Sequence, residues 1–192
     1  MNVIVDGVIY GYQSKGDIPR IFTEILPRMC EMEEGLSISL LLFNTPKGDL
    51  PTHPRIIENR MYLSNLPTLN SRAKKIIRYT TKISARVSLG DTHKKIWHST
   101  YYSSLPKWDG PYVVTLHDLI YELHPNLFPD SNVIIPQKYK ELSRADIILC
   151  DSNSTKQDLM ELYRFPEDKI KIVYPGYNPV FILQSPIKSY YQ

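Results

Sequence analysis

The chain has 192 residues, of which 42% are hydrophobic and 22% are charged, and its formal net charge is +3. This length suits one domain or at most two small ones, and the composition argues against a disordered or collagen-like chain. No apolar run approaches the ~20 residues that a bilayer-spanning helix needs, and the first residues do not resemble a secretory signal. Two cysteines, Cys30 and Cys150, are too few for a disulfide framework and fit a reducing cytoplasm.

The first part of the chain combines apolar runs with one clear helical pattern. Residues 2–10 indicate a buried strand, and residues 11–17 a polar loop that contains glycine. Apolar side chains then recur at helical spacing over residues 18–29, with Asp17 as the expected N-cap. Pro27 is expected to kink or shorten that helix, because proline removes a backbone donor. Two further strands are predicted over residues 37–43 and 55–63.

A basic segment follows at residues 71–95. It holds eight lysine and arginine residues against one acidic residue, a local balance of +7 that leaves the rest of the chain at −4. Apolar residues recur in it at helical spacing, and the opposite side of that helix carries Lys75, Arg78, Lys82 and Arg86. Such a helix can lie on an anionic membrane or hold a phosphorylated ligand, and it can equally be a solvated helix face. Nucleic acid is not expected, because aromatic residues are not interleaved with these charges.

The remaining elements complete an α/β pattern. Strands are predicted over residues 95–100, 112–117, 146–150 and 170–174, and helices over residues 131–144 and 154–164. Ser154 is expected to open the last helix through a capping box. Short Val- and Ile-rich strands that alternate with helices predict a Rossmann-like parallel sheet with helices on both faces. Residues 1–180 are expected to form this domain, and residues 181–192, which lose periodicity, a linker or tail.

Polar loops follow several of these strands. Ligands bind at the carboxyl ends of the strands in a parallel α/β sheet, so residues 11–17, 98–102 and 117–119 should gather there. The histidines, cysteines and carboxylates show no metal-ligand spacing, and no metal site is predicted. The glycines do not match the dinucleotide-binding fingerprint.

Four segments carry a resemblance to a known family. They are Trp97-His-Ser-Thr-Tyr-Tyr102, Val113-Val-Thr-Leu-His-Asp-Leu119, Cys150-Asp-Ser-Asn-Ser-Thr-Lys-Gln-Asp-Leu159 and Asp168-Lys-Ile-Lys-Ile-Val-Tyr-Pro-Gly-Tyr-Asn-Pro179. In this order and spacing, they resemble the N-terminal half of group 1 glycosyltransferases, the retaining family 4 with the GT-B fold. The likeness covers residues 2 to about 181.

The resemblance implies a sugar-transfer reaction. Enzymes of this family move a sugar from a nucleotide-sugar to an acceptor hydroxyl with retention, usually without a metal. Their N-terminal domain mostly receives the acceptor, and their C-terminal domain holds the nucleotide through two glutamates separated by seven residues. This chain has no such glutamate pair. The donor-binding domain is therefore expected elsewhere, in the same chain or in a partner.

The resemblance also implies roles for single residues. His117 takes the position that faces the donor sugar, although a structural histidine is the competing interpretation, and Asp118 is expected to cap the next segment rather than fix the ring. Gly16 and Lys15 take the place of the family's donor-phosphate loop, but Asp17 departs from its paired glycines and would repel phosphate. The expected acceptor-side residues are Tyr101, Tyr102, Lys75 and Arg78, with packing as the alternative for the two tyrosines.

Two functional hypotheses remain open. The first is the acceptor-binding domain of a retaining glycosyltransferase of hexosyltransferase type, inactive without its donor domain. It would act on a carbohydrate or lipid-linked acceptor in the cytoplasm, peripherally at the membrane face if the basic helix binds lipid. The second is a stand-alone, non-enzymatic α/β module that binds an anionic carbohydrate, a lipid head group or a partner protein.

Overall fold

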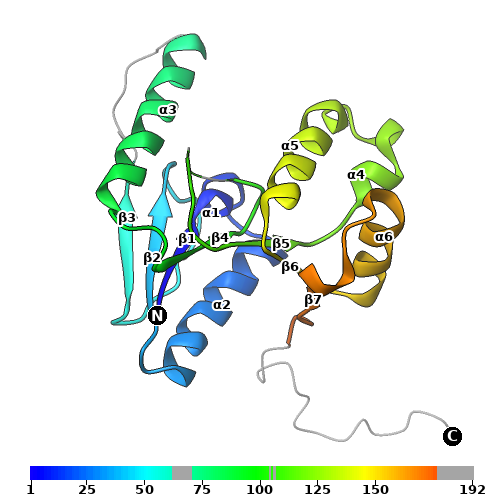
Figure 1. The fold of residues 1–192 in the computed structure, drawn as a ribbon. Coiled ribbons are helices and arrows are strands. Elements are labelled where there is room, and N and C mark those ends of the chain that lie inside the picture. Colours follow the sequence, from blue (N-terminus) through cyan, green and yellow to red (C-terminus); the bar gives the residue numbers. More distant parts are fainter. Residues whose placement is uncertain (62–70, 104, 106, 177–192) are drawn as a thin grey trace, which may run out of the picture.

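The computed structural model describes residues 1–61, 71–103, 105 and 107–176, apart from the side chains of residues 71–75 and 78. Seven parallel strands form one sheet in the order β3-β2-β1-β4-β5-β6-β7 (Figure 1). The strands are β1 (Asn2–Asp6), β2 (Ser37–Leu42), β3 (Ile56–Arg60), β4 (Lys95–Ser99), β5 (Tyr112–Leu116), β6 (Ile147–Cys150) and β7 (Ile170–Ile172). The predicted Rossmann-like parallel sheet is confirmed.

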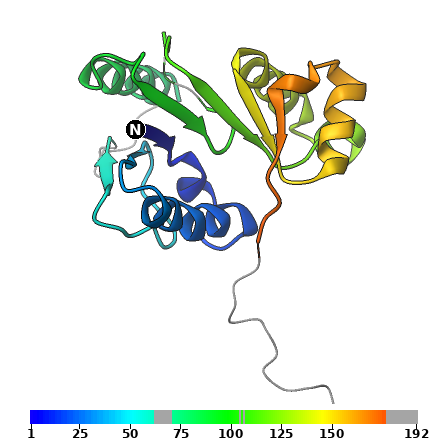
Figure 2. The same ribbon diagram turned by 60° about the horizontal axis from the view of Figure 1, so that its bottom comes forward.

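Helices cover both faces of the sheet, as expected. The helices are α1 (Val8–Tyr12), α2 (Asp17–Met32), α3 (Ser71–Ser88), α4 (Ile120–Leu123), α5 (Ser131–Arg144) and α6 (Asn153–Tyr163), with short 3-10 turns at Pro125–Leu127 and Glu167–Lys169. One face carries α1 and α2, and the other carries α3 to α6 (Figure 2). The chain order explains this division, because right-handed crossovers from β1 to β2 and from β3 to β4 run in opposite directions.

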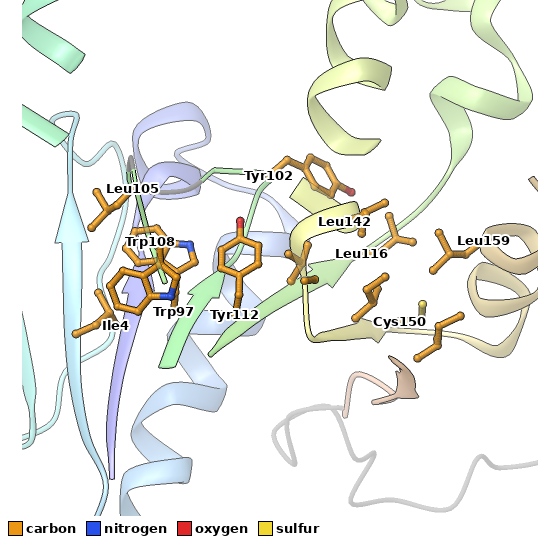
Figure 3. Close-up of a cluster of buried hydrophobic side chains, with 14 of the residues drawn as sticks. Ile4, Trp97, Tyr102, Leu105, Trp108, Tyr112, Leu116, Leu142, Cys150 and Leu159 are labelled. Carbon is orange, nitrogen blue, oxygen red and sulfur yellow. The ribbon is translucent and has the colours of Figure 1, made fainter. Parts of the chain in front are cut away.

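The core is divided by the sheet. Alternate residues of β1 point to opposite faces, so Val3 and Val5 pack with α2 while Ile4 joins the cluster on the other face. Figure 3 shows this second cluster, in which Trp97 of β4 lies beside Trp108, with ring centroids 5.6 Å apart. The indole nitrogens are both satisfied, since Trp97 donates to the carbonyl of Ser103 and Trp108 to that of Pro111.

The first strand is shorter than predicted. The interpretation of residues 2–10 as one strand is wrong after Asp6, because residues 8–12 form helix α1. At Gly7 the backbone N–H donates to the carbonyl of Leu41, and a Cβ there would lie 2.9 Å from that oxygen. The backbone approaches β2 so closely that only glycine fits, and the chain turns at this point.

Helix boundaries differ from the sequence expectations at two places. Helix α2 continues through Pro27 to Met32, and its N-cap is Gly16, not Asp17. Packing of Phe22, Leu26 and Cys30 on both sides of Pro27 compensates for the lost backbone bond. Helix α6 is capped by Ser152, whose Oγ accepts from the N–H of Thr155, two residues before the predicted cap. Within the described residues, no helix is long and apolar enough to cross a membrane.

Candidate functional site

The candidate site lies where β5 and β6 end. His117 follows β5, and Asp151 follows β6, whose last residue pairs in register with the last residue of β5. The Nε2 atom of His117 lies 3.3 Å from the carbonyl oxygen of Thr100, and Nδ1 lies 3.7 Å from Oδ2 of Asp151. The ring of Phe22, from α2, meets the imidazole edge-on. Three strand ends and one helix therefore hold the ring of His117.

The hydrogen bond to Thr100 determines which nitrogen of His117 carries the proton. A carbonyl oxygen only accepts, so Nε2 is the donor and Nδ1 of the neutral ring is the basic atom. Burial lowers the pKa of His117, and the Thr100 carbonyl and the carboxylates of Asp151 and Asp118 partly oppose that shift. The ring is thus neutral near pH 7, and a proton added at Nδ1 would face Asp151.

Thr100 is itself fixed by a buried carboxylate. Asp6, at the end of β1, accepts hydrogen bonds from the backbone N–H and the hydroxyl of Thr100 and from the hydroxyl of Ser103. Burial raises the pKa of Asp6, and these hydroxyl bonds counteract the rise. The sequence analysis missed Asp6, although a lone acidic residue at the end of an apolar strand was visible. It links β1, the turn after β4 and His117 into one polar network.

A groove opens beside His117 on the α2 face of the sheet. It has a volume of about 450 Å³ and is walled by Ile21, Phe22 and Ile25 of α2 and by apolar side chains of β4, β5 and β6. His98, His117 and Asp151 are among its few polar lining residues. His98 lies close to Thr115, with Nε2 2.8 Å from the hydroxyl, and burial lowers its pKa to about 4. This half of the sheet face has no covering helix among the described elements (Figure 2).

A second, more polar cavity of about 440 Å³ adjoins the groove. The two share Asp151, Pro175 and two isoleucines of α2, and the polar cavity is lined further by Asp17, Arg20, Glu24 and Arg28. Arg28 is paired with Glu24 at 2.9 Å. Arg20, one turn into α2, is a cation at this cavity that the sequence analysis did not select. The groove therefore makes His117 and Asp151 accessible to a ligand, and Asp151 also faces the polar cavity.

The predicted phosphate loop directly precedes Asp17, a residue that lines the polar cavity. Lys15 and Gly16 are exposed immediately before α2, and neither is among the residues that line the two cavities. Asp17, whose negative charge was expected to disfavour phosphate, does line the polar cavity. The structure therefore brings His117 together with Asp151, whereas Asp17 lines only the adjoining polar cavity and Lys15 lines neither.

The predicted acceptor-side residues divide into three cases. Tyr102 is 6% exposed and adopts a positive φ of 49°, with its ring in the core 5.3 Å from Nζ of Lys138. Tyr101 is half-buried against Tyr12, with ring centroids 6.0 Å apart. Lys75 and Arg78 lie on α3, but their side chains are outside the described part of the chain.

Two other predictions concern polar groups near the site. Asp118 caps the segment after it, since its Oδ1 accepts from the N–H of Ile120, as the sequence analysis favoured. Among the residues that the structure describes, no group of His, Cys, Asp and Glu side chains could hold a metal ion.

The family model that matches this chain is that of glycosyltransferase family 4, and it covers residues 33–181. This match includes β2 to β7 and the residues of the candidate site that follow residue 32, among them Thr100, His117 and Asp151. The chain belongs to glycosyltransferase family 4. The resemblance expected from the sequence is thus confirmed for this glycosyltransferase family 4 domain.

The fold comparison agrees with the family. A UGT transferase from Siraitia grosvenorii, solved in complex with UDP, matches 91% of this family 4 chain with a TM-score of 0.53 at 10% identity. The match extends over only 50% of the Siraitia chain, so the present chain spans about half the length of that relative. The α/β sheet thus corresponds to half of a transferase of this fold. No curated protein matches the chain in sequence.

Proposed function

We propose that this domain is the acceptor-binding half of a retaining glycosyltransferase that moves a hexosyl group from a nucleotide-sugar to an acceptor hydroxyl. The observation that carries the proposal is the position of His117, which lies beside Asp151 in an apolar groove at the carboxyl ends of β5 and β6 of a family 4 domain. Ligands of parallel α/β sheets bind at this edge. The UDP complex of the Siraitia transferase supports a nucleotide-sugar as donor.

In this proposal, His117 acts on the sugar rather than on the acceptor proton. A donor in the cleft would meet the neutral imidazole at Nδ1, where a donor hydroxyl can give a hydrogen bond. As the bond between sugar and phosphate breaks, positive charge develops on the sugar ring. The nearby Asp151 carboxylate would stabilise that charge. The leaving phosphate can take the acceptor's proton, so no general base is required from this chain.

The second wall of the cleft would come from a donor-binding domain, in the same chain or in a partner. Two observations support this arrangement: the fold match covers half of the Siraitia chain, and no described element covers the sheet at the apolar groove. Parallel sheets are normally covered on both faces. Residues 1–180 would form the acceptor-side domain, and residues 181–192, outside the described part of the chain, would lead toward the other half.

Two groups of residues, both containing cations, are suited to the two substrates. Lys15 and Gly16 at the start of α2, with Arg20 inside the polar cavity, would approach the donor diphosphate, and no metal is invoked. Tyr101, Lys75 and Arg78 would contact a carbohydrate or lipid-linked acceptor. The free, buried thiols of Cys30 and Cys150 fit a cytoplasmic location, where nucleotide-sugars would be met.

The test measures nucleotide release and sugar transfer after the chain is combined with its donor domain. UDP-glucose and GDP-mannose serve as donor probes, and His117→Ala is compared with His124→Ala, whose side chain is exposed. We expect the His117 variant to lose at least about 100-fold in turnover, while the His124 variant stays active. Unchanged turnover of His117→Ala would contradict the role of His117. Nucleotide binding without any transfer would favour a non-enzymatic module.

A further inference from the structure

Helix α3 carries apolar side chains on its solvent side. Ile76, Tyr79, Ile83 and Val87 are between 39% and 72% exposed, and their spacing brings them onto one stripe of the helix. Ala85 is the only fully buried residue of α3 whose side chain is described. The sequence pattern left open what the apolar side faces, and in the structure most of it faces solvent. Figure 1 shows α3 standing apart from α5 on the same face of the sheet.

A wide, basic cleft lies directly beside this stripe. It has a volume of about 740 Å³, and its cationic lining residues are Lys82, Lys107, Lys140 and Arg144. The one carboxylate in its lining, Glu141, accepts from the hydroxyl of Tyr112 at 2.6 Å and lies 3.6 Å from Arg144. The cleft is therefore strongly cationic. Nothing in the proposed sugar-transfer site uses it.

Tyr79 joins the stripe and the cleft into one surface. It belongs to the exposed apolar stripe and also lines the cleft, as does its helical neighbour Lys82. A helix that lies in the interface of an anionic bilayer needs an apolar face and, beside it, cationic side chains. The apolar side chains enter the acyl boundary, and the cations meet lipid phosphates.

We propose that α3 and the basic cleft form a docking surface for an anionic phospholipid bilayer. The stripe enters the interface, and the cleft receives a lipid phosphate between α3 and α5. Charge favours this partner over a second copy of the chain, because residues 71–95 carry +7 and two such segments would repel each other. The remainder of the chain, at −4, would turn away from the membrane. This inference rests on the proposed function and deepens it, because a domain docked on the bilayer would lie beside a lipid-linked acceptor.

The experiment is flotation of the 192-residue chain with vesicles of phosphatidylcholine alone or mixed with phosphatidylglycerol. We expect binding to the anionic vesicles only, weakened by salt. Ile83→Asp with Val87→Asp should reduce binding at least about tenfold, because an acidic side chain resists entry into the lipid interface. Lys107→Gln with Lys140→Gln should reduce it about fivefold for each lysine. Circular dichroism checks that every variant remains folded.

Matched controls lie on other faces of the domain. Met32→Asp replaces an exposed apolar residue at the end of α2, and Lys171→Gln removes an exposed charge from β7. Both should leave flotation unchanged. Equal binding to neutral vesicles, no binding to either kind, or a stripe-dependent dimer in solution would overturn the proposal. So would specific binding of inorganic phosphate by the cleft without any affinity for vesicles. Flotation needs no sugar transfer, so it can fail while the proposed activity stands.

Discussion

His117 and Asp151 face each other across two hydrogen-bonded strands, with Nδ1 of the imidazole 3.7 Å from Oδ2 of the carboxylate. Leu116 and Cys150, the residues just before them, are partners in the register of β5 and β6. The pair is therefore a direct consequence of strand alignment. It gives the candidate site a basic nitrogen beside an anion, at the mouth of an apolar groove.

The first prediction concerns the protonation of His117. Its pKa should lie below the usual value of 6.5 because the ring is buried, and Asp151→Asn should lower it further by removing a stabilising negative charge. NMR titration of the imidazole C–H signals measures both values. Asp168→Asn, an exposed carboxylate before β7, is the control. A pKa of His117 that rises or stays constant in Asp151→Asn would contradict the assignment.

The second prediction concerns stability toward acid. The pKa of His98 is about 4 in the folded chain and 6.5 in its ordinary state, so only the unfolded chain takes up this proton between those values. The free energy of unfolding should therefore fall as the pH drops from about 6.5 to 4, by at most about 3 kcal/mol from this residue. His98→Asn should flatten that slope in urea titrations. His124→Asn should leave it steep.

The third prediction concerns the carboxylate of Asp6. Asp6→Ala removes the carboxylate shared by Thr100 and Ser103, so the buried backbone N–H of Thr100 and hydroxyl of Ser103 lose their acceptor. We expect the free energy of unfolding to fall by about 2–4 kcal/mol. The C–H signals of His117 should also move, because its Nε2 partner is Thr100. Asp49→Ala, at an exposed position, should stay within about 0.5 kcal/mol of the unmodified chain. A loss under about 1 kcal/mol for Asp6→Ala would argue against the network.

The fourth prediction concerns the buried lysine that supports the turn after β5. Nζ of Lys138 donates to the carbonyl of Asp118 at 3.1 Å and to Glu122 at 2.9 Å. Lys138→Met should destabilise the domain by about 3–5 kcal/mol, because Glu122 would remain buried without its cationic partner and keep only the hydrogen bond from Tyr163. Adding Glu122→Leu should recover much of that loss in denaturant unfolding. If the double variant were as unstable as the single one, the unpaired charge would not be the cause.

The strand order illustrates what hydrophobic patterning can predict. Continuous runs such as Tyr112–Leu116 and Ile147–Cys150 indicated strands of a parallel sheet, and both are interior strands, although alternate residues of each line the groove and are only partly buried. Patterning failed after Gly7, where an apolar run forms α1 instead. The reason is a contact distant in sequence: the backbone of β2 meets Gly7 and forces the chain to turn.

Helix α3 shows a different limit. Its helical period was evident from the sequence, and the helix forms. Which side faces solvent was not evident, because periodicity identifies an apolar stripe without saying whether any surface covers it. Of the expected stripe, Ile76, Ile83 and Val87 are exposed in the folded domain.

The sequence by itself determined the α/β class and the parallel sheet and selected His117 as a candidate, because strand-forming runs and family motifs are local properties. Only the tertiary structure decided that Asp151, rather than the adjacent Asp118, faces the imidazole. Hydrogen bonds between β5 and β6 join positions 34 residues apart in sequence. The same packing buried Tyr102 and left the groove beside His117 open, since both depend on where α2 and α5 cover the sheet and where they do not.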